Sequence, residues 1–212
     1  MSQNSKGHFI TFEGPEGCGK TEQIKRLALR LGAESKHVLT LREPGGTEIG
    51  EKLRQILKDP KNTEMFPLTE LLLFAASRHQ LVQEVIKPAL ERGAFVLCDR
   101  FLDSTVVYQH FARGLPRHLI DELNNIAIAG CEPDTTIVLK ITPAESRRRL
   151  QRRSADVGST SACKFDEESD DFFAKVLEGY NSLIGSRYFH INGARSMVEV
   201  ETDIWDHLQT TH

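Results

Sequence analysis

The chain carries the stretch Gly14-Pro15-Glu16-Gly17-Cys18-Gly19-Lys20-Thr21 close to its N-terminus. This stretch matches the phosphate-loop pattern GxxxxGK[ST] at every fixed position. An apolar, β-branched run at His8–Glu13 precedes the loop, and apolar residues at helical spacing follow it. The motif requires this context, because the N–H groups of the loop and the N-terminus of the helix bind phosphate together. We therefore predict an α/β fold in which this loop binds the phosphates of a nucleotide.

Each polar side chain of the loop has a predicted role. Lys20 is expected to reach the β- and γ-phosphates, and the Thr21 hydroxyl is expected to ligate Mg²⁺. The Glu16 carboxylate would weaken phosphate binding if it faced the phosphates, so we expect it to point toward a hydroxyl group or the acceptor side. A glycine-rich turn without a ligand is the alternative. The motif alone does not distinguish a kinase from a hydrolase or a switch.

Strand-like and helix-like segments alternate along the chain without a repeat or a linker. This alternation predicts a P-loop fold in which a five-stranded parallel sheet is flanked by helices. Residues 1–212 are expected to form one domain with a short arginine-rich lid at about 145–170. Glu43–Gly46 and Ser154–Lys164 are predicted to be mobile loops. The predicted strands are His8–Glu13, His37–Leu41, Ala94–Cys98, Thr135–Ile141 and Tyr188–Ile191.

Two predicted helices matter for the site. One begins near Pro67, is kinked or ended locally by Pro88, and stops at Gly93. The other is capped by Thr47. Its predicted inner face consists of Ile49, Leu53, Ile56 and Leu57.

Composition narrows the class of protein. The 27 basic and 30 acidic residues give a net charge of −3, which argues against a nucleic-acid-binding protein. No apolar run is long enough for a membrane span, and the polar N-terminus does not fit a signal peptide. The four cysteines form no metal-binding pattern. We expect a cytoplasmic enzyme with reduced thiols.

Two pairs of residues suit a nucleotide acceptor. Asp99 and Arg100 follow a buried strand, where Asp99 would hold magnesium through water and Arg100 would bind a phosphate. Phe74 and Arg78 lie one helical turn apart, which suits stacking on a base and hydrogen bonding to its edge. The alternatives are a local salt bridge for the first pair, and a core phenylalanine with a surface arginine for the second.

An arginine cluster follows Pro143, and a group of acidic residues comes soon after it. A solvated charged helix face and a lid that closes over a triphosphate are both consistent with this pattern. The cluster consists of Arg147, Arg148, Arg149, Arg152 and Arg153.

These motifs together resemble those of the bacterial thymidylate kinases, which are nucleoside monophosphate kinases with the P-loop fold. The resemblance covers most of the chain, from about Phe9 to Tyr180. It rests on the loop and on the stretches Arg42-Glu43-Pro44-Gly45-Gly46-Thr47, Glu51-Lys52-Leu53-Arg54, Leu71-Leu72-Leu73-Phe74-Ala75-Ala76-Ser77-Arg78, Asp99-Arg100-Phe101 and Ser104-Thr105-Val106-Val107-Tyr108-Gln109.

The resemblance implies phosphorylation of thymidine monophosphate (dTMP) by Mg-ATP, in the biosynthesis of dTTP, by a homodimer. It implies that Gly14–Thr21 bind ATP, and that Thr21, Asp99 and Glu43 lie near Mg²⁺. Phe74 would stack on thymine, Arg78 would bond its edge, and Tyr108 would disfavour a 2′-hydroxyl on the sugar. The other residues implied at the dTMP site are Glu43, Glu16 near the 3′-hydroxyl, Arg54 and Arg100 at the acceptor phosphate, and Ser104, Thr105 and Gln109 around the base.

The family resemblance also implies that basic residues of the lid take part in catalysis, because Gly17 stands where some relatives have an arginine. Arg153 and Lys164 are the predicted lid residues, acting with Lys20, Asp99 and Arg100. The chain departs from the family pattern at Glu22, after the Tyr108-Gln109 pair, and in its longer lid.

Two other functions remain open at this point. The acceptor could be a different nucleoside monophosphate, although the pairs Phe74/Arg78 and Tyr108/Gln109 argue against it. A P-loop switch is a second class, but the chain lacks the NKxD and DxxG motifs of GTPases.

Overall fold

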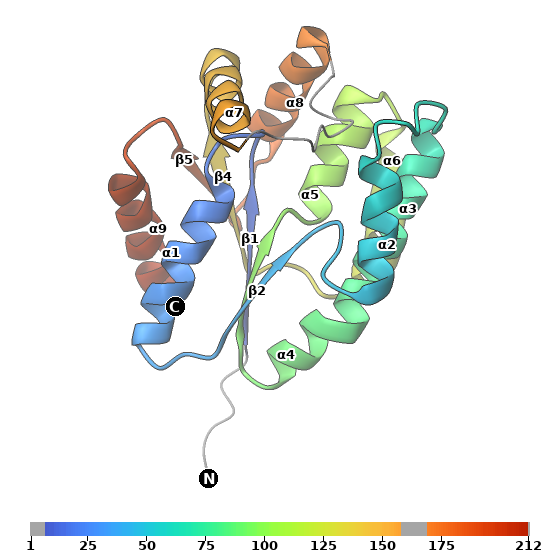
Figure 1. Cartoon of the computed structure of the whole chain (residues 1–212). Coiled ribbons are helices and arrows are strands. Elements are labelled where there is room, and N and C mark those ends of the chain that lie inside the picture. The colour runs from blue at the N-terminus through green and yellow to red at the C-terminus, as the bar shows by residue number, and fades with distance from the viewer. Residues whose placement is uncertain (1–6, 158–168, 212) are drawn as a thin grey trace.

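Five parallel strands form the central sheet, in the order β2-β3-β1-β4-β5 (Figure 1). The computed structural model describes residues 7–157 and 169–211, with side chains for 7–152 and 169–210. The predicted α/β fold with a five-stranded parallel sheet is confirmed. The strands are β1 (His8–Glu13), β2 (Val38–Arg42), β3 (Phe95–Asp99), β4 (Thr135–Lys140) and β5 (Tyr188–Asn192).

The register brings the ends of three strands to one edge of the sheet. Asp99 of β3 lies opposite Phe12 of β1 and opposite Arg42 of β2. The phosphate loop and the segments that begin at Glu43 and Arg100 therefore leave the sheet side by side. In open parallel sheets, ligands bind outside this carboxyl edge, where neighbouring strands lead in different directions.

Helices cover both faces of the sheet (Figure 1). On one face, Ile24 and Leu27 of α1 and Ile204 of α9 pack in one core cluster with Ile10 and Leu139 of the sheet. Leu31 of α1 and Val200 and Leu208 of α9 are also buried, whereas Val198 of α9 is 63% exposed. The helices are α1 (Lys20–Ala33), α2 (Glu48–Lys58), α3 (Pro67–Leu81), α4 (Lys87–Glu91), α5 (Leu102–Thr105), α6 (Arg117–Ile128), α7 (Pro143–Val157), α8 (Asp170–Ser182) and α9 (Met197–Thr211), with π-helical segments η1 (Val82–Ile86) and η2 (Val106–Ala112).

The predicted inner face of α2 is wrong in part. Leu57 is fully buried, but Ile49 is 51% exposed and Ile56 is 45% exposed. The helix packs against α3 at the periphery of the molecule, and no element of the described chain covers its outer side. The periodicity of apolar residues indicates which face of a helix favours burial. It does not indicate whether the same chain or another molecule covers that face.

Pro88 does not end the helix that begins at Pro67, but a π-helical turn precedes it in that helix. The π-helical segment η1 lies between α3 and α4, and the N–H of Lys87 bonds to the carbonyl of Val82. A proline cannot donate a hydrogen bond to the carbonyl four residues earlier, and its ring crowds that carbonyl. The wider turn relieves both problems, so the helix continues to Glu91 before Gly93 adopts a φ of 78°.

The segment Glu43–Gly46, predicted to be mobile, is instead held by backbone hydrogen bonds. The N–H of Glu43 donates to the carbonyl of Asp99 (2.9 Å), and that of Gly45 donates to Ser77 Oγ (3.1 Å). The N–H of Gly46 donates to Glu51 Oε1 (2.8 Å). The prediction failed because these acceptors come from other elements. Of the second predicted loop, residues 154–157 belong to α7, and residues 158–164 lie outside the described residues.

Thr47 caps α2, and its replacement tests how much the cap stabilises the fold. Its buried Oγ1 accepts a hydrogen bond from the N–H of Gly50 (2.9 Å). We expect Thr47→Ala to lower the free energy of unfolding by about 1 kcal/mol, because this N–H loses its partner. Urea denaturation measures the change. Thr47→Ser keeps the cap and should stay within about 0.5 kcal/mol of the wild type. Equal losses in both variants would refute the capping role.

Candidate active site

A cavity of about 840 Å³ opens at the carboxyl edge of the sheet. Pockets of this size hold small molecules and cofactors. Among the described residues, Gly14, Pro15 and Cys18 of the phosphate loop do not line it. The predicted site residues that do line it are Glu16, Gly17, Gly19, Lys20, Thr21, Glu43, Arg54, Phe74, Arg78, Asp99, Arg100, Ser104, Thr105, Tyr108 and Gln109.

The phosphate loop has the conformation that the motif predicts. Gly14 has a φ of 139°, and a Cβ atom there would lie 2.3 Å from the carbonyl oxygen of Leu139, so only glycine fits. Gly19 has a φ of 102° and leads directly into the first turn of α1. The loop and the helix N-terminus together form an anion-binding site.

Lys20 is the buried cation of this loop. Its Nζ donates to the carbonyl oxygens of Gly14 (3.0 Å) and Pro15 (3.1 Å). Burial and the charge of Arg100 act to lower the pKa of Lys20, but the neighbouring acidic groups outweigh them and hold this pKa above its usual value. Lys20 is therefore charged at neutral pH and is available to phosphate oxygens.

Thr21 and Asp99, which are both expected near Mg²⁺, are in direct contact. The Thr21 hydroxyl donates to Asp99 Oδ2 (2.7 Å). A hydroxyl and a carboxylate are the oxygen donors that Mg²⁺ uses when phosphates and water complete its coordination. The backbone of Glu43 is adjacent, because its N–H bonds to the carbonyl of Asp99, but the Glu43 carboxylate is directed to Arg78.

The Arg100 guanidinium lies at the centre of a set of oxygen acceptors. Its Nη1 donates to Tyr180 Oη (2.7 Å) and Ser104 Oγ (3.1 Å). Its Nη2 donates to Glu16 Oε1 (2.8 Å) and Tyr108 Oη (3.2 Å). The Glu16 carboxylate thus faces Arg100.

The charges around Glu16 keep its carboxylate ionised. Burial acts to raise the pKa of Glu16, but Arg100, Lys20 and Lys58 outweigh burial and lower it to about 2. Lys58 lies at the end of α2 and lines the cavity, although no sequence motif singled it out. Arg54 also lines the cavity from α2, and its Nη1 donates to the carbonyl of Pro44 (2.8 Å).

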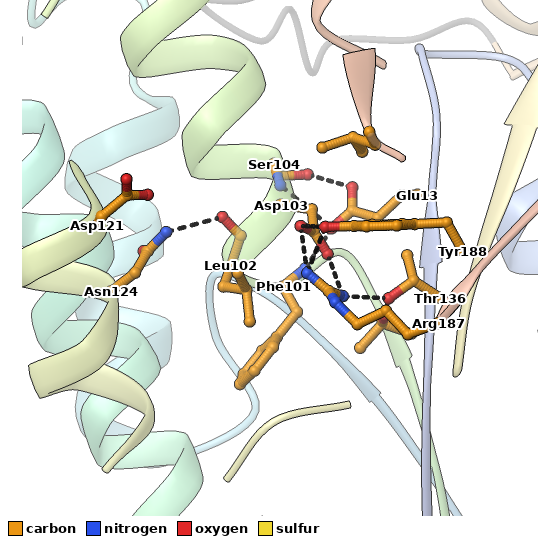
Figure 2. A network of polar contacts seen from close by, with 12 residues as sticks. Glu13, Phe101, Leu102, Asp103, Ser104, Asp121, Asn124, Thr136, Arg187 and Tyr188 are labelled. Atoms are coloured by element: carbon orange, nitrogen blue, oxygen red, sulfur yellow. Dashed lines mark hydrogen bonds and ion pairs between the residues drawn. The ribbon is translucent and has the colours of Figure 1, made fainter. Parts of the chain in front are cut away.

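A buried carboxylate, Glu13, holds the turn that carries Arg100. The backbone of Arg100 has a φ of 71°, a strained conformation for a residue other than glycine. Glu13 Oε1 accepts the N–H groups of Phe101 (2.8 Å) and Ser104 (3.2 Å). Glu13 Oε2 accepts a hydrogen bond from the hydroxyl of Ser104 (2.6 Å; Figure 2). It also accepts one from the hydroxyl of Tyr180 (3.2 Å), and Arg100 donates to both of these hydroxyl oxygens.

Glu13 should make stability depend on pH near neutrality. Burial, and then the nearby Asp103, raise the pKa of Glu13 to about 7. Arg187 and Tyr188 hold Asp103 beside it (Figure 2). Because the folded protein binds this proton more tightly than the unfolded chain, the stabilisation is complete below about pH 4.5 and is lost as pH rises through about 7.

The Glu13→Gln variant isolates this effect, because glutamine has the same shape and does not titrate. We expect the wild type to lose stability relative to Glu13→Gln between pH 5 and pH 8, in urea denaturation at a series of pH values. Parallel stability curves for the two proteins would contradict the shifted pKa of Glu13.

Arg78 is 1% exposed and is held on every side by the protein. It pairs with Glu43 (Nη2 to Oε1, 2.7 Å; Nε to Oε2, 3.1 Å). It also donates to Asn124 Oδ1 (2.6 Å), to Thr105 Oγ1 (2.7 Å) and to the carbonyl of Phe101 (3.2 Å). Because Arg78 is buried, the alternative interpretation of a surface arginine at this position is wrong.

The candidate base-binding residues come from two helical segments. Phe74 of α3 is partly buried against the cluster that contains Tyr108, and both residues line the cavity. The π-helical segment η2 carries Tyr108 and Gln109. Extra residues in such a turn redirect side chains, and π-helical turns occur often at functional sites.

Helix α7, in the predicted lid region, brings Arg149 to the cavity. Arg149 lines the cavity and donates to the carbonyls of Gly17 (3.2 Å) and Gly193 (3.0 Å). Arg147 and Arg148 are mostly exposed and pair with acidic residues on the lid helices. Arg153 lies in α7, but its side chain is outside the described residues, as is Lys164.

Several residues of the site escaped the analysis of the sequence. Arg149 was one of a cluster, and its spacing did not separate it from its neighbours. Tyr180 belongs to none of the motifs, and it appears in the sequence only as an aromatic residue of the region that becomes α8. Glu13 carried one signal, since it is a carboxylate at the end of an otherwise apolar buried strand.

Comparison with known proteins agrees with this geometry. The sequence profile of the family described as "Thymidylate kinase" matches residues 12–204. The thymidylate kinase of Thermoanaerobacter sp. (strain X514) is 48% identical over 204 residues, which cover 95% of this chain and 97% of that protein. That of Geobacter sulfurreducens is 47% identical, with coverages of 94% and 95%. That of Bacillus pumilus is 40% identical, with coverages of 97% and 96%.

The matched residues include the phosphate loop, the Asp99-Arg100 turn and the cavity walls on α3 and η2. These identities hold over nearly the whole length of both proteins, so the likeness is not confined to a common phosphate-binding motif. The chain belongs to the thymidylate kinase family, a family of nucleoside monophosphate kinases.

Proposed function

We propose that this protein transfers the γ-phosphoryl group of ATP to the 5′-phosphate of dTMP, yielding dTDP and ADP in nucleotide biosynthesis. The observation that carries the proposal is that one cavity joins Lys20 of the phosphate loop to Arg100 and to the walls formed by Phe74 and Gln109. A donor phosphate at the loop and an acceptor phosphate at Arg100 would therefore meet inside one site.

The chemistry follows from charge. The acceptor oxygen of a nucleoside monophosphate is already ionised at neutral pH, so it attacks the γ-phosphorus without a general base. The bond between the acceptor oxygen and the γ-phosphorus forms as the bond between the γ-phosphorus and the β-phosphate oxygen breaks. Lys20, Arg100 and Arg149 neutralise and position the phosphates. Thr21 and Asp99 would hold Mg²⁺, which would supply positive charge that neutralises the phosphates of ATP.

The acceptor side of the cavity supports a deoxynucleotide. Tyr108 is buried and its hydroxyl accepts a hydrogen bond from Arg100, so its ring is fixed beside the acceptor-phosphate arginine. A rigid ring in that position leaves little room for a 2′-hydroxyl. Glu16, ionised and paired with Arg100, is in a position to accept a hydrogen bond from the 3′-hydroxyl.

A coupled assay of ADP release tests the proposal. We expect rapid turnover with ATP, Mg²⁺ and dTMP, little turnover without an acceptor, and none after chelation of the metal. dUMP, dCMP and UMP serve as competing acceptors. Faster turnover of dCMP or UMP than of dTMP would overturn the choice of acceptor. Slow hydrolysis without an acceptor, accelerated by a protein partner, would favour a switch.

We infer that the whole chain, residues 1–212, acts as one domain whose lid spans about residues 145–170. The contact of Arg149 with the carbonyl of Gly17 supports this, because it joins α7 directly to the phosphate loop. We also propose a cytoplasmic location, supported by the buried free thiols of Cys18 and Cys98. No helix in the described ranges has the length and apolar character that a membrane crossing requires.

We propose that a second copy of the chain covers the exposed apolar side chains of α2, α3 and α6. Ile49 and Leu72 are about half exposed, and Ile126 is 69% exposed, on helices that pack against each other. Monomeric proteins rarely expose so many large apolar side chains together. We expect light scattering to give the mass of a dimer, and Leu72→Asp to give a monomer. Leu29→Asp, at an exposed position on α1, should leave the dimer intact. A monomeric wild type would refute the proposal.

A further inference from the structure

Glu70 is a buried carboxylate beside the base-binding wall, and neither the motifs nor the mechanism gives it a role. It lies in the first turn of α3 and is 1% exposed. Its Oε1 accepts a hydrogen bond from Gln109 Nε2 (3.0 Å). Arg113, at the end of η2, donates to both of its oxygens (3.2 and 3.4 Å). Burying a carboxylate is costly unless several donors compensate, so the arrangement calls for an explanation.

The contact determines how the amide group of Gln109 is oriented. An ionised carboxylate only accepts hydrogen bonds, whereas an amide has an NH₂ end that donates and a carbonyl end that accepts. If the amide of Gln109 were rotated by half a turn, its carbonyl oxygen would face the Glu70 carboxylate, and the two would repel. Glu70 therefore holds the NH₂ group toward itself, so the carbonyl oxygen Oε1 of Gln109 is directed away from it.

That carbonyl oxygen remains available as an acceptor. Gln109 lines the cavity, and within the described part of the chain its Oε1 accepts no hydrogen bond. Arg78 lines the same cavity, but its guanidinium is bonded to Glu43, Asn124 and Thr105 and to the carbonyl of Phe101. The amide oxygen of Gln109 is thus an acceptor of fixed orientation on the cavity wall.

A fixed acceptor distinguishes pyrimidine bases by their hydrogen-bonding groups. Thymine and uracil carry an N–H donor at N3 next to a carbonyl acceptor at C4. Cytosine carries an acceptor at N3 next to an NH₂ donor at C4. The fixed amide oxygen therefore pairs with the N3–H of thymine, but it would face the N3 lone pair of cytosine. A site built to bond one pattern rejects the other, because its own polar groups are left unpaired.

We propose that Glu70 is a specificity-determining positioning residue, which fixes the amide of Gln109 so that the site accepts thymine and rejects cytosine. Glu70 acts through Gln109 and does not touch the substrate. The inference rests on the proposed function, because it requires that the base of the acceptor bind against Gln109.

The Glu70→Gln variant tests this directly. Glutamine has the same shape and can still accept hydrogen bonds from Arg113, but it can also donate, so the amide of Gln109 becomes free to rotate. We expect the ratio of kcat/KM for dTMP to kcat/KM for dCMP to fall about tenfold or more, the discrimination typical of one hydrogen bond. If the variant only lost packing, kcat/KM would fall for both dTMP and dCMP, and the ratio of the two values would stay unchanged.

A double-mutant cycle separates action through Gln109 from other effects of the variant. The cycle compares Glu70→Gln in the wild type and in the Gln109→Leu background, where no amide remains to be oriented. We expect Glu70→Gln to change the dTMP:dCMP ratio in the wild type and to leave it unchanged in the Gln109→Leu background. Equal changes in both backgrounds would overturn the proposal.

Two further variants control for the pairing with Arg113 and for folding. Arg113→Gln breaks the ion pair but keeps the contact between Glu70 and Gln109, so base preference should be retained even if stability falls. Glu70→Asp keeps a group that only accepts hydrogen bonds, so it should retain more of the preference for dTMP over dCMP than Glu70→Gln does. Thermal denaturation measures the stability of both variants, and this order of preference should not depend on which of them is less stable. Loss of preference in Arg113→Gln, or equal loss in Glu70→Asp and Glu70→Gln, would count against the mechanism.

The wild-type measurement separates failure of this inference from failure of the proposed function. A wild type that prefers dCMP, or that does not phosphorylate dTMP, would refute the proposed function and this inference with it. A wild-type preference for dTMP that survives Glu70→Gln unchanged would refute the role of Glu70 alone.

Discussion

Lys20→Ala is expected to lower kcat/KM for phosphoryl transfer to dTMP by about 10²- to 10³-fold. This is the typical loss when a preorganised charge that stabilises the transition state is removed from a site that excludes water. Lys20 is buried, and the acidic groups around it hold its pKa above the usual value, so the ammonium is present throughout the neutral range. The transferring phosphoryl group would lose its nearest fixed cation.

Steady-state kinetics with both nucleotides measure the effect of Lys20→Ala. Because the Lys20 ammonium bonds to the loop carbonyls of Gly14 and Pro15, thermal denaturation must show that the variant remains folded. Lys52→Ala, which removes an exposed lysine from α2, is the matched control and should retain normal activity. Retention of more than about a tenth of the wild-type kcat/KM by Lys20→Ala would contradict the assigned role.

Arg100→Ala should cause a loss of similar size, but with a different kinetic pattern. The guanidinium carries the fork of donors that suits an acceptor phosphate, and its four partners hold it in one position. We expect KM for dTMP to rise and kcat to fall, so that kcat/KM drops by about 10²- to 10³-fold, while ATP binding changes little. Isothermal titration with an ATP analogue that is not hydrolysed tests the second part.

Two variants sharpen the test of Arg100. Arg100→Lys keeps the charge but loses the fork, so it should lie between the wild type and Arg100→Ala. Arg117→Ala removes an exposed arginine that pairs with Asp121 and should behave as the wild type. If Arg100→Ala weakened the binding of ATP as much as the binding of dTMP, Arg100 would also act on the donor nucleotide. That result would contradict its assignment to the acceptor.

The fold was predictable from the sequence because its signals are local. The strand before the loop, the glycines of the loop and the apolar face of α1 each depend on a few consecutive residues, and the structure places all three as expected. The prediction for α2 failed where the signal was not local. Ile49 and Ile56 follow the helical period, but nothing in that period shows which molecule covers them.

The candidate site was predictable only in outline. The motifs named most residues of the cavity wall, but they did not show how these residues pair with one another. Glu43 was expected near the metal, and its backbone does lie beside Asp99, whereas its carboxylate pairs with Arg78. Among the arginines of the lid, only the packing of α7 against the phosphate loop distinguished Arg149 from the exposed Arg147 and Arg148.

The sequence by itself determined the order of the strands and helices, the phosphate loop and the family. Only the tertiary structure decided which polar groups meet. Glu43 and Arg78 are 35 positions apart, Gln109 and Glu70 are 39 apart, and Glu13 and Phe101 are 88 apart. A hydrogen bond depends on a few tenths of an ångström between atoms, and chain segments this distant in sequence reach such distances only when the whole sheet and its helices have packed.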